Sequence, residues 1–596
     1  MNKRLVIALL CLFLCWSAKA ELAIYNDLRY DIDWIEGTAQ VAENQTLGWN
    51  KKQDIQITIP ATITVGQRTY KVTGITENAF KGCKYLTGIV LPDGLEYLSR
   101  SAFEGTGIWL NKENWNEGVL FIDSCLVASD KTIAPRYLVP SSTRLVAAGA
   151  FQGNKTITRV ELPSTITRID NDVFRDCKNL TKVIIPHSVQ WIGQDAFLNT
   201  GIWLNEKKWR KGALYIDSCL IAVNDNAPAA FVFKDKVPTR LMAAGAFRGA
   251  KQLRTITLPE RITIIPVACF YQCEALQEVV IPEAVKRIER LAFSDCTHLK
   301  AIRLPQGLKS IGAGAFSKCG NIKEALLPDS IIGIPTACFF LCKELKSVTL
   351  PAHLEVISDG AFAGCANLEA PILPATLKHI GEKAFAACGR FRKVNIPATV
   401  TTIKKAAFTD CSHLYEITLP EGLYAIDDET FNNCLSLERI TLPKALYRIG
   451  KRAFNNCLEL YNLQITDNVH VIEEEAFMDC KKLYEIALPP LLKALESGAF
   501  ASCINLTKLT LNEQLTAIGD GAFYQCRQLK EVFLPDSVST IGEDAFMECK
   551  NLRAIRIPQG LKTIGANAFR DCESLRQPAL PAETIVGKNA FKGCKK

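Results

Sequence analysis

Cysteine is the residue with the most chemical potential in this sequence, because a thiolate can bind metals, attack substrates or form disulfides. The chain of 596 residues contains 23 cysteines, and two pairs have the spacing Cys-Phe-x-x-Cys: Cys269 with Cys273 and Cys338 with Cys342. A structural zinc site usually needs two such pairs at a fixed separation, and no second pair accompanies either one. Elsewhere the sequence has Ala-Phe-x-x-Cys, so the first cysteine replaces an alanine. We therefore interpret both pairs as small core residues.

Most of the cysteines, including the second member of each pair, recur at a fixed spacing. Seventeen, from Cys83 to Cys594, follow a phenylalanine by three residues. Equivalent side chains in stacked repeats point the same way, whereas a disulfide needs Cβ atoms that face each other. The same position also holds residues that cannot form a disulfide, namely Thr106, Asn154, Thr200 and Ala250. The pattern predicts a buried ladder of free thiols rather than a disulfide framework.

No other residues are arranged for catalysis. The six histidines stand at repeat positions that elsewhere hold ordinary surface residues. Cys296-x-His298 and Cys411-x-His413 are 115 residues apart, too far along a rod to share a metal ion. The sequence lacks G-x-S-x-G, H-E-x-x-H and a phosphate-cradling glycine loop. We predict that the protein is not an enzyme and uses no metal or cofactor.

The cysteine motif is one part of a 23-residue repeat, and the repeat must position everything else. From Phe247 to Phe569 a phenylalanine recurs every 23 residues, and the flanking steps bring the total to about 21 repeats. One repeat, from Cys526, reads C-R-Q-L-K-E-V-F-L-P-D-S-V-S-T-I-G-E-D-A-F-M-E-C. Its L-x-x-V-x-L segment has the spacing of a leucine-rich-repeat strand, which the following proline ends.

A single repeat cannot bury its own apolar face, but a stack of repeats can. The sequence therefore predicts a β-rich leucine-rich-repeat solenoid, a right-handed coil with short parallel strands on one face and a small β cap at the N-terminus. The expected organisation is a signal peptide at 1–20, the β cap at 21–66 and the solenoid at 67–596. Insertions interrupt the solenoid at about 105–131 and 199–228.

The first 20 residues have the pattern of a secretory signal peptide. Lys3 and Arg4 precede an apolar run, and Ala18-Lys19-Ala20 offers a cleavage site. The apolar run of about 12 residues is shorter than the ~20 that span a bilayer, and no later stretch is long enough. We predict an exported protein, secreted or at the cell surface, without a transmembrane segment. The formal net charge of the chain is +8, and three of these positive charges lie in the predicted signal peptide. The small remaining charge and the lack of a basic tract argue against nucleic-acid binding.

The unit Pro-x-x-[LV]-x-x-I-x-x-x-A-F-x-x-C-x-x-L resembles the BspA-type leucine-rich repeat family over the chain from Gln67 onward. Ile57-Thr58-Ile59-Pro60 followed by Tyr70-Lys71-Val72-Thr73-Gly74-Ile75 also resembles the module that precedes the first repeat in that family. The resemblance implies a surface or secreted protein, mostly bacterial, that acts in adhesion. It further implies that the partners are proteins of a host matrix, of plasma or of bacterial surfaces.

The two insertions copy each other at an offset of 94 residues and carry four tryptophans, Trp109, Trp115, Trp203 and Trp209. Each insertion ends in two apolar runs about an Asp-Ser turn, which predicts a β-hairpin. Tryptophans on loops held by a rigid frame are typical of binding sites. The alternative is that these rings hold the insertion against the solenoid.

Exposed positions of the predicted strands hold a second set of candidates. Tyr415, Tyr461 and Tyr484 occupy one column, and Phe533 stands in a neighbouring column. Aromatic side chains in register could form a binding stripe. The alternative is solvated tyrosines. The same column is otherwise largely basic, which we interpret as solvated charge, at Arg254, Lys300, Lys323, Lys346, Lys530, Arg553 and Arg576.

The sequence as a whole predicts a binding scaffold for proteins, with adhesion as its function. One alternative is a structural surface protein that self-associates through the C-terminal end, where the chain stops inside the motif at Cys594-Lys595-Lys596. Another is a glycan-binding module that uses the tryptophan insertions.

Overall fold

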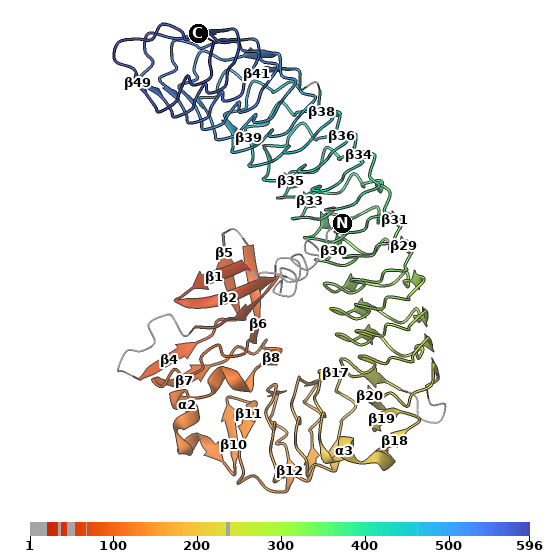
Figure 1. The fold of residues 1–596 in the computed structure, drawn as a ribbon. Helices are drawn as coiled ribbons and strands as arrows, with labels where there is room; N and C mark the ends of the chain where they lie inside the picture. The colour runs from red at the N-terminus through yellow and green to blue at the C-terminus, as the bar shows by residue number, and fades with distance from the viewer. Residues whose placement is uncertain are drawn as a thin grey trace. The chain divides into compact units, whose positions relative to one another are not determined.

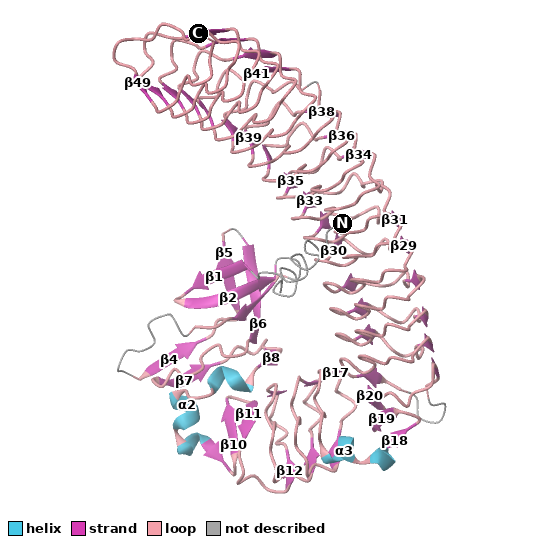
Figure 2. Cartoon of the chain, in the orientation of Figure 1, coloured by secondary structure: helices cyan, strands magenta, loops and turns pink. Residues whose placement is uncertain are grey.

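The computed structural model describes residues 21–33, 37–44, 54–66, 68–233, 239–461 and 463–595. The predicted signal peptide lies outside these ranges. The chain divides into two compact units, Met1–Leu253 with Thr257–Tyr271, and Arg254–Ile256 with Gln272–Lys596. Both units are built from stacked turns of about 23 residues, about 22 turns in all, with short strands and little helix (Figure 1, Figure 2). The predicted solenoid is confirmed.

A curled sheet precedes the turns, in the strand order β1-β2-β3-β6-β5. Its core includes Tyr30, Tyr70 and Val72, which are fully buried. The sheet continues past residue 66 because β6 pairs with both β3 and β5. β6 also pairs with the strand β8 of the first turns, so the cap and the solenoid share a sheet. The strands are β1 (Glu21–Tyr25), β2 (Leu28–Asp33), β3 (Thr38–Val41), β5 (Thr62–Val65) and β6 (Arg68–Ile75).

Most turns carry two short strands, each of which pairs in parallel with its equivalent in neighbouring turns. The first strand lies in the L-x-x-[IV]-x-L segment, as in β45 (Glu531–Phe533), which pairs with β47 (Ala554–Arg556). The second lies after the proline, as in β46 (Thr540–Ile541), which pairs with β48 (Thr563–Ile564). We call these the first and the second strand column. The sequence predicts the first column, and the structure adds the second.

The other strands of the first column follow in chain order: β4 (Ile55–Thr58), β7 (Leu86–Val90), β12 (Arg136–Leu138), β14 (Arg159–Glu161), β16 (Lys182–Ile184), β21 (Ala230–Phe231), β23 (Thr255–Thr257), β25 (Glu278–Val280), β27 (Ile302–Arg303), β29 (Glu324–Leu326), β31 (Ser347–Thr349), β34 (Lys393–Asn395), β36 (Glu416–Thr418), β38 (Arg439–Thr441), β41 (Glu485–Ala487) and β43 (Lys508–Thr510).

Those of the second column are β8 (Tyr97–Leu98), β13 (Leu145–Val146), β15 (Arg168–Ile169), β17 (Trp191–Ile192), β22 (Leu241–Met242), β24 (Ile264–Ile265), β26 (Arg287–Ile288), β28 (Ser310–Ile311), β30 (Gly333–Ile334), β32 (Val356–Ile357), β33 (His379–Ile380), β35 (Thr402–Ile403), β37 (Ala425–Ile426), β39 (Arg448–Ile449), β40 (Val471–Ile472), β42 (Ala494–Leu495), β44 (Ala517–Ile518) and β49 (Ile585–Val586).

A ladder of phenylalanine rings forms the centre of the core. The Phe454 ring is fully buried, and its centroid lies 5.4 Å from that of Phe431 and 5.2 Å from that of Phe477. The Phe454 and Phe477 rings are nearly parallel, at 2°. Stacked rings of this kind contribute beyond the area that they bury, so each turn is held mainly by its two neighbours.

The cysteine of each motif extends this ladder. The Cys457 thiol donates a hydrogen bond of 3.3 Å to the carbonyl oxygen of Phe431 in the preceding turn, and the same bond recurs from Cys319 to Cys594. None of the 21 cysteines of the described residues forms a disulfide. Burial raises the pKa of Cys411 to about 12 and that of Cys549 to about 12. The thiols are therefore neutral core groups.

Each insertion forms a hairpin and completes a turn of its own. The amide of Ser129 donates to the Ala150 carbonyl (2.8 Å). In a regular turn the amide of the phenylalanine makes this bond, as Phe174 does with Ala196 (2.8 Å), so Ser129 stands at the phenylalanine position. In the second insertion Val223 takes the phenylalanine position. The short helices are α2 (Gly107–Leu110), α3 (Gly201–Leu204), η1 (Arg100–Phe103), η2 (Lys112–Asn114) and η3 (Glu206–Lys208). The strands are β9 (Trp115–Asn116), β10 (Val119–Ile122), β11 (Cys125–Ser129), β18 (Trp209–Arg210), β19 (Ala213–Ile216) and β20 (Cys219–Val223).

The turn that contains each insertion has no first-column strand, and two of its side chains make hydrogen bonds to the neighbouring turn instead. The Asp123 carboxylate accepts from the Leu91 amide (2.9 Å), and the Arg144 guanidinium donates to the carbonyls of Pro92 and Asp93 (2.9 and 3.0 Å). Asp217 and Arg240 make the corresponding contacts in the second insertion, with Ile185 and Pro186. These bonds satisfy a sheet edge that would otherwise have unpaired backbone groups.

We expect Asp123→Ala to destabilise the N-terminal turns by about 1–3 kcal/mol, because the half-buried Leu91 amide loses its acceptor. Urea denaturation followed by tryptophan fluorescence measures this, since every tryptophan lies before residue 210. Asp93→Ala is the matched control, because it removes an exposed carboxylate from the same loop. Equal losses in the two variants would show that the Asp123 hydrogen bond contributes nothing specific.

Candidate functional site

The three predicted tyrosines form an exposed column beside the first strand column. Their exposed fractions are 37% for Tyr415, 45% for Tyr461 and 58% for Tyr484. Bonds between turns fix their backbone: the Tyr415 amide donates to the Arg392 carbonyl, and the Tyr484 carbonyl accepts from Thr507, both at 2.9 Å. We call these three residues the tyrosine column. The tyrosine column therefore presents three solvated rings, two of them on backbone that is hydrogen-bonded between turns.

Phe533 is exposed, at 63%, but it is not part of the tyrosine column. It ends β45, at the opposite end of its strand from the tyrosine column and two turns beyond Tyr484. In the next turn it pairs in register with Arg556. The structure therefore keeps this ring and the tyrosines as separate features.

A second aromatic group lies just before the second strand column. The Tyr424 and Tyr447 rings stack at 5.1 Å and 6°, and the His470 ring stacks on Tyr447 at 4.5 Å and 21°. The Nδ1 atom of His470 lies 2.8 Å from the Asn468 carbonyl oxygen. His470 was not among the residues predicted from the sequence, although it follows Tyr447 by 23 residues, the length of one repeat.

The four tryptophans of the insertions form two separate pairs. The Trp115 indole N–H donates to the Trp109 carbonyl at 2.9 Å, and the two rings meet edge to face at 5.2 Å and 90°. Trp203 and Trp209 repeat this geometry, at 2.7 Å and 5.1 Å. All four are half-buried and packed against the core. The indole donors of Trp115 and Trp209 are used within the fold, which favours a structural role over ligand binding.

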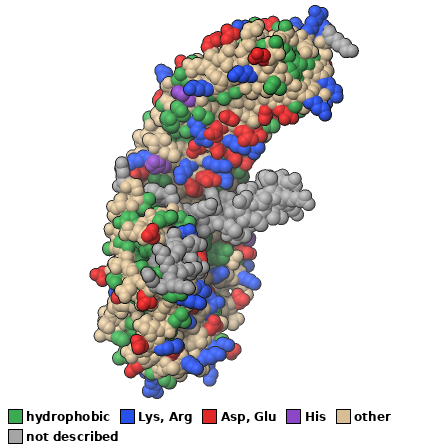
Figure 3. All heavy atoms as spheres, turned by 90° about the vertical axis from the view of Figure 1, so that its left-hand side faces the viewer, with side chains coloured by type: hydrophobic (Ala, Val, Ile, Leu, Met, Phe, Trp, Pro, Cys, Tyr) green, Lys and Arg blue, Asp and Glu red, His purple; other side chains and the backbone are tan. Residues whose placement is uncertain are grey.

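Charged side chains are paired along both strand columns. Arg448 lies 2.7 Å from Asp428 and 2.8 Å from Glu473, and burial raises the pKa of the neighbouring Asp427. Lys393 pairs with Glu416 at 2.7 Å. Acidic and basic side chains are interspersed on the face drawn in Figure 3.

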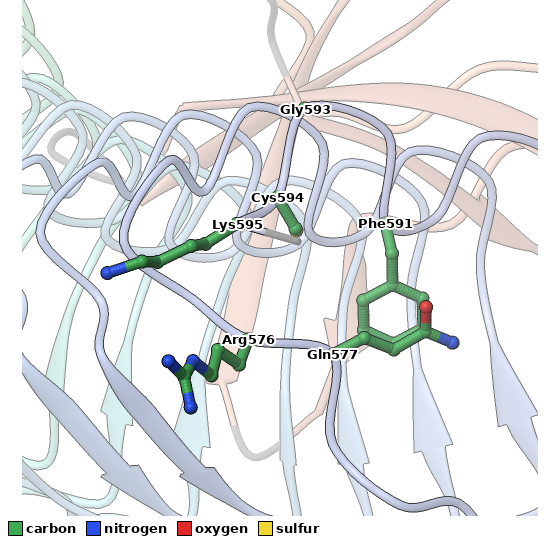
Figure 4. A pocket seen from close by; sticks show the side chains of 6 residues that line it. All are labelled: Arg576, Gln577, Phe591, Gly593, Cys594 and Lys595. Atoms are coloured by element: carbon green, nitrogen blue, oxygen red, sulfur yellow. The ribbon is translucent and has the colours of Figure 1, made fainter.

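The last described turn has a shallow hollow of about 630 Å³ (Figure 4). Its lining offers two cations and one aromatic ring but no carboxylate for acid–base work. Among the described residues, no three or more His, Cys, Asp and Glu side chains are grouped to hold a metal ion. Within the same residues, no helix has the length and apolar character to cross a membrane. The hollow is lined by Arg576, Gln577, Phe591, Gly593, Cys594 and Lys595.

Three solved structures illustrate what the chain is similar to. A leucine-rich repeat protein from Bacteroides ovatus is 18% identical, with 87% of this chain and 98% of that chain covered and a TM-score of 0.25. A leucine rich cell surface protein from Faecalibacterium prausnitzii is 18% identical, with 82% and 94% covered and a TM-score of 0.28. The T. pallidum leucine rich repeat protein is 26% identical, with 35% and 89% covered and a TM-score of 0.28. No curated protein matches the chain.

The family model for the BspA type leucine rich repeat region matches the chain in six copies. The matched residues are 60–133, 136–219, 236–346, 333–461, 378–504 and 470–596. They include nearly all of the turns described above, and the resemblance seen in the sequence is confirmed. The chain belongs to the BspA type leucine rich repeat family.

Proposed function

We propose that this protein is a non-enzymatic, exported adhesion scaffold that binds proteins of a host or of neighbouring cells through the tyrosine column. The observation that carries the proposal is the exposure of Tyr415, Tyr461 and Tyr484 in one register. Tyrosine offers a large amphipathic contact area with few rotatable bonds, so it loses little entropy on binding. It is also enriched among the residues that dominate protein interfaces.

The rigid frame around the column supports the same proposal. Inter-turn bonds hold the backbone of Tyr415 and Tyr484, and the Lys393–Glu416 pair orders the adjoining side chains. A surface that is already ordered avoids much of the entropic cost of association. The half-buried tryptophan pairs offer no comparable free surface, and for this reason we assign binding to the tyrosines.

We expect replacement of all three tyrosines by alanine to weaken protein binding on the order of 100-fold, about 3 kcal/mol, because interface energy is concentrated in such residues. The measurement is surface plasmon resonance of Glu21–Lys596 against a panel of matrix proteins, plasma proteins and bacterial cell extracts. Glu438→Ala, in the same column, is the matched control and should bind as the parent does. Binding that survives the triple substitution, or silence against the whole panel, would contradict the proposal.

Two further measurements separate the competing functions. A concentration-dependent increase in mass by light scattering would favour a self-associating surface protein. Binding to a glycan array that is lost on deletion of 105–130 and 199–225 would favour a glycan-binding module. The adhesion proposal expects a monomer and no such glycan binding.

A further inference from the structure

Aliphatic side chains are exposed in alternate turns of the second compact unit, well before the tyrosine column. Val280, Leu326 and Ile372 each stand two residues before the proline that follows the first strand column. Their exposed fractions are 47%, 60% and 92%. The turns between them hold the exposed Arg303 and Thr349 at the same position. We call the three aliphatic residues the aliphatic row.

Ile372 shows that this exposure is built into the turn. Pro371 takes the strand position that elsewhere holds a buried aliphatic residue, and it has no N–H to donate to a ladder. No first-column strand forms between β31 and β34. Ile372, which follows Pro371, is the most exposed large hydrophobic side chain of the described residues. Exposed aliphatic side chains that recur in register offer a partner a line of apolar contacts.

A row of lysines runs parallel to the aliphatic row, at the other end of the first-column strands. Lys300, Lys323 and Lys346 are exposed in three successive turns. No ion pair of the described residues includes any of them, whereas Lys393 and Lys508 at the next strand position pair with Glu416 and Glu485. We call these three residues the lysine row. Because they form no ion pair, their ammonium groups are available to the carboxylates of an acidic partner.

The spacing of the aliphatic row selects the shape of that partner. Parallel strands lie ~4.8 Å apart, so alternate turns repeat every ~9.6 Å. Residues seven apart in an α-helix are separated by ~10.5 Å and share one face. A β-strand repeats on one face every ~6.7 Å and fits less well. A helix along the row would place positions i, i+7 and i+14 beside the three aliphatic side chains.

We propose that the aliphatic and lysine rows together bind an acidic amphipathic α-helix of a partner protein. The helix lies along the stack of turns, with its apolar face on the aliphatic row and its carboxylates beside the lysine row. The aliphatic row lies at another strand position than the tyrosine column, and the lysine row precedes that column by at least three turns in the same register. Binding of the helix does not depend on the tyrosines.

The probe is a fluorescein-labelled 21-residue peptide of Glu, Ala and Gln with Leu at positions 4, 11 and 18. Fluorescence anisotropy with the full mature chain is expected to show binding, and difference circular dichroism a gain of helix. Leu326→Ser and Lys323→Glu should each weaken binding about tenfold. Lys530→Glu is the matched control, because Lys530 has the same strand position as Lys323 but lies at least seven turns beyond the aliphatic row. This substitution should leave the affinity for the peptide unchanged. Thermal denaturation establishes that each variant is folded.

Each contrary result overturns the proposal. Equal binding of a peptide with the same composition in shuffled order would show that only charge is recognised. Unchanged affinity in folded Leu326→Ser would exclude the aliphatic row and point to a general polyanion site. Binding without a gain of helix would indicate an extended partner, and absence of binding would remove the surface altogether. If the peptide binds as expected but the protein binding screen of the tyrosine column is negative, only the function proposed above is contradicted.

Discussion

Raising the pH from 8 to 11 in the presence of a reductant, which keeps every cysteine from oxidising, is expected to unfold the repeat array. Burial raises the pKa of Cys342, Cys411 and Cys549 from 9.0 to about 12, so these thiols stay protonated in the folded chain. In the unfolded chain they ionise above pH 9. Their stabilising contribution is complete below pH 9 and is lost as the pH rises toward 12, at about 1.4 kcal/mol per thiol and pH unit. Many such thiols act together.

The thiol contribution can be separated from that of other groups that titrate at high pH. A variant with alanine at five neighbouring cysteines should lose less stability per pH unit than the parent, because five ionisations are removed. Alanine already occupies this position at Ala250. Urea midpoints at pH 8, 9 and 10, followed by circular dichroism, make the comparison. Parallel pH profiles of parent and variant would rule out the thiols as the cause. The replaced residues are Cys457, Cys480, Cys503, Cys526 and Cys549.

We expect Phe454→Ala to destabilise its part of the array by about 3–5 kcal/mol. The substitution removes a fully buried ring from between Phe431 and Phe477 and leaves a cavity that a close-packed stack cannot refill. Urea denaturation and amide hydrogen exchange of the neighbouring turns measure the loss. Exchange resolves which turns open, since a repeat array need not unfold in one step.

Tyr447→Ala is the matched control, because Tyr447 belongs to the same turn and also lies between two stacked rings. Its ring is half-exposed on the surface, so its loss should cost about 1 kcal/mol or less. A similar effect of both substitutions would mean that stacking, rather than burial, provides the stability of the ladder.

The repeat itself was predictable because its determinants are local in sequence. A phenylalanine every 23 residues, with cysteine three residues later, fixes the turn length and the core positions before any contact is known. The free thiols followed from the parallel stacking of equivalent side chains. The exposure of Tyr415, Tyr461 and Tyr484 followed from their place between buried strand residues. Whether these tyrosines bind a partner stays a prediction.

What the sequence left open depends on contacts between turns. The insertions were identified by their copied tryptophans, but only the Ser129–Ala150 and Val223–Ala246 bonds show that each one is a turn without phenylalanine. Asp123 and Arg144 look like ordinary surface residues until the missing strand is seen. The second strand column escaped because its strands are two residues long, too short for any periodic pattern.

Within each strand column, hydrogen bonds join one turn to the next, and this arrangement has a mechanical consequence. They run along the stack, so a force applied along a unit acts in full on every inter-turn contact, and the contacts break one at a time because they do not share the load. A folded turn occupies ~4.8 Å of that length, whereas 23 residues pulled straight span ~75 Å. Each turn that detaches therefore lengthens the chain more than tenfold locally and leaves the remaining turns intact. Under tension the molecule would behave as an extensible tether that yields in equal steps.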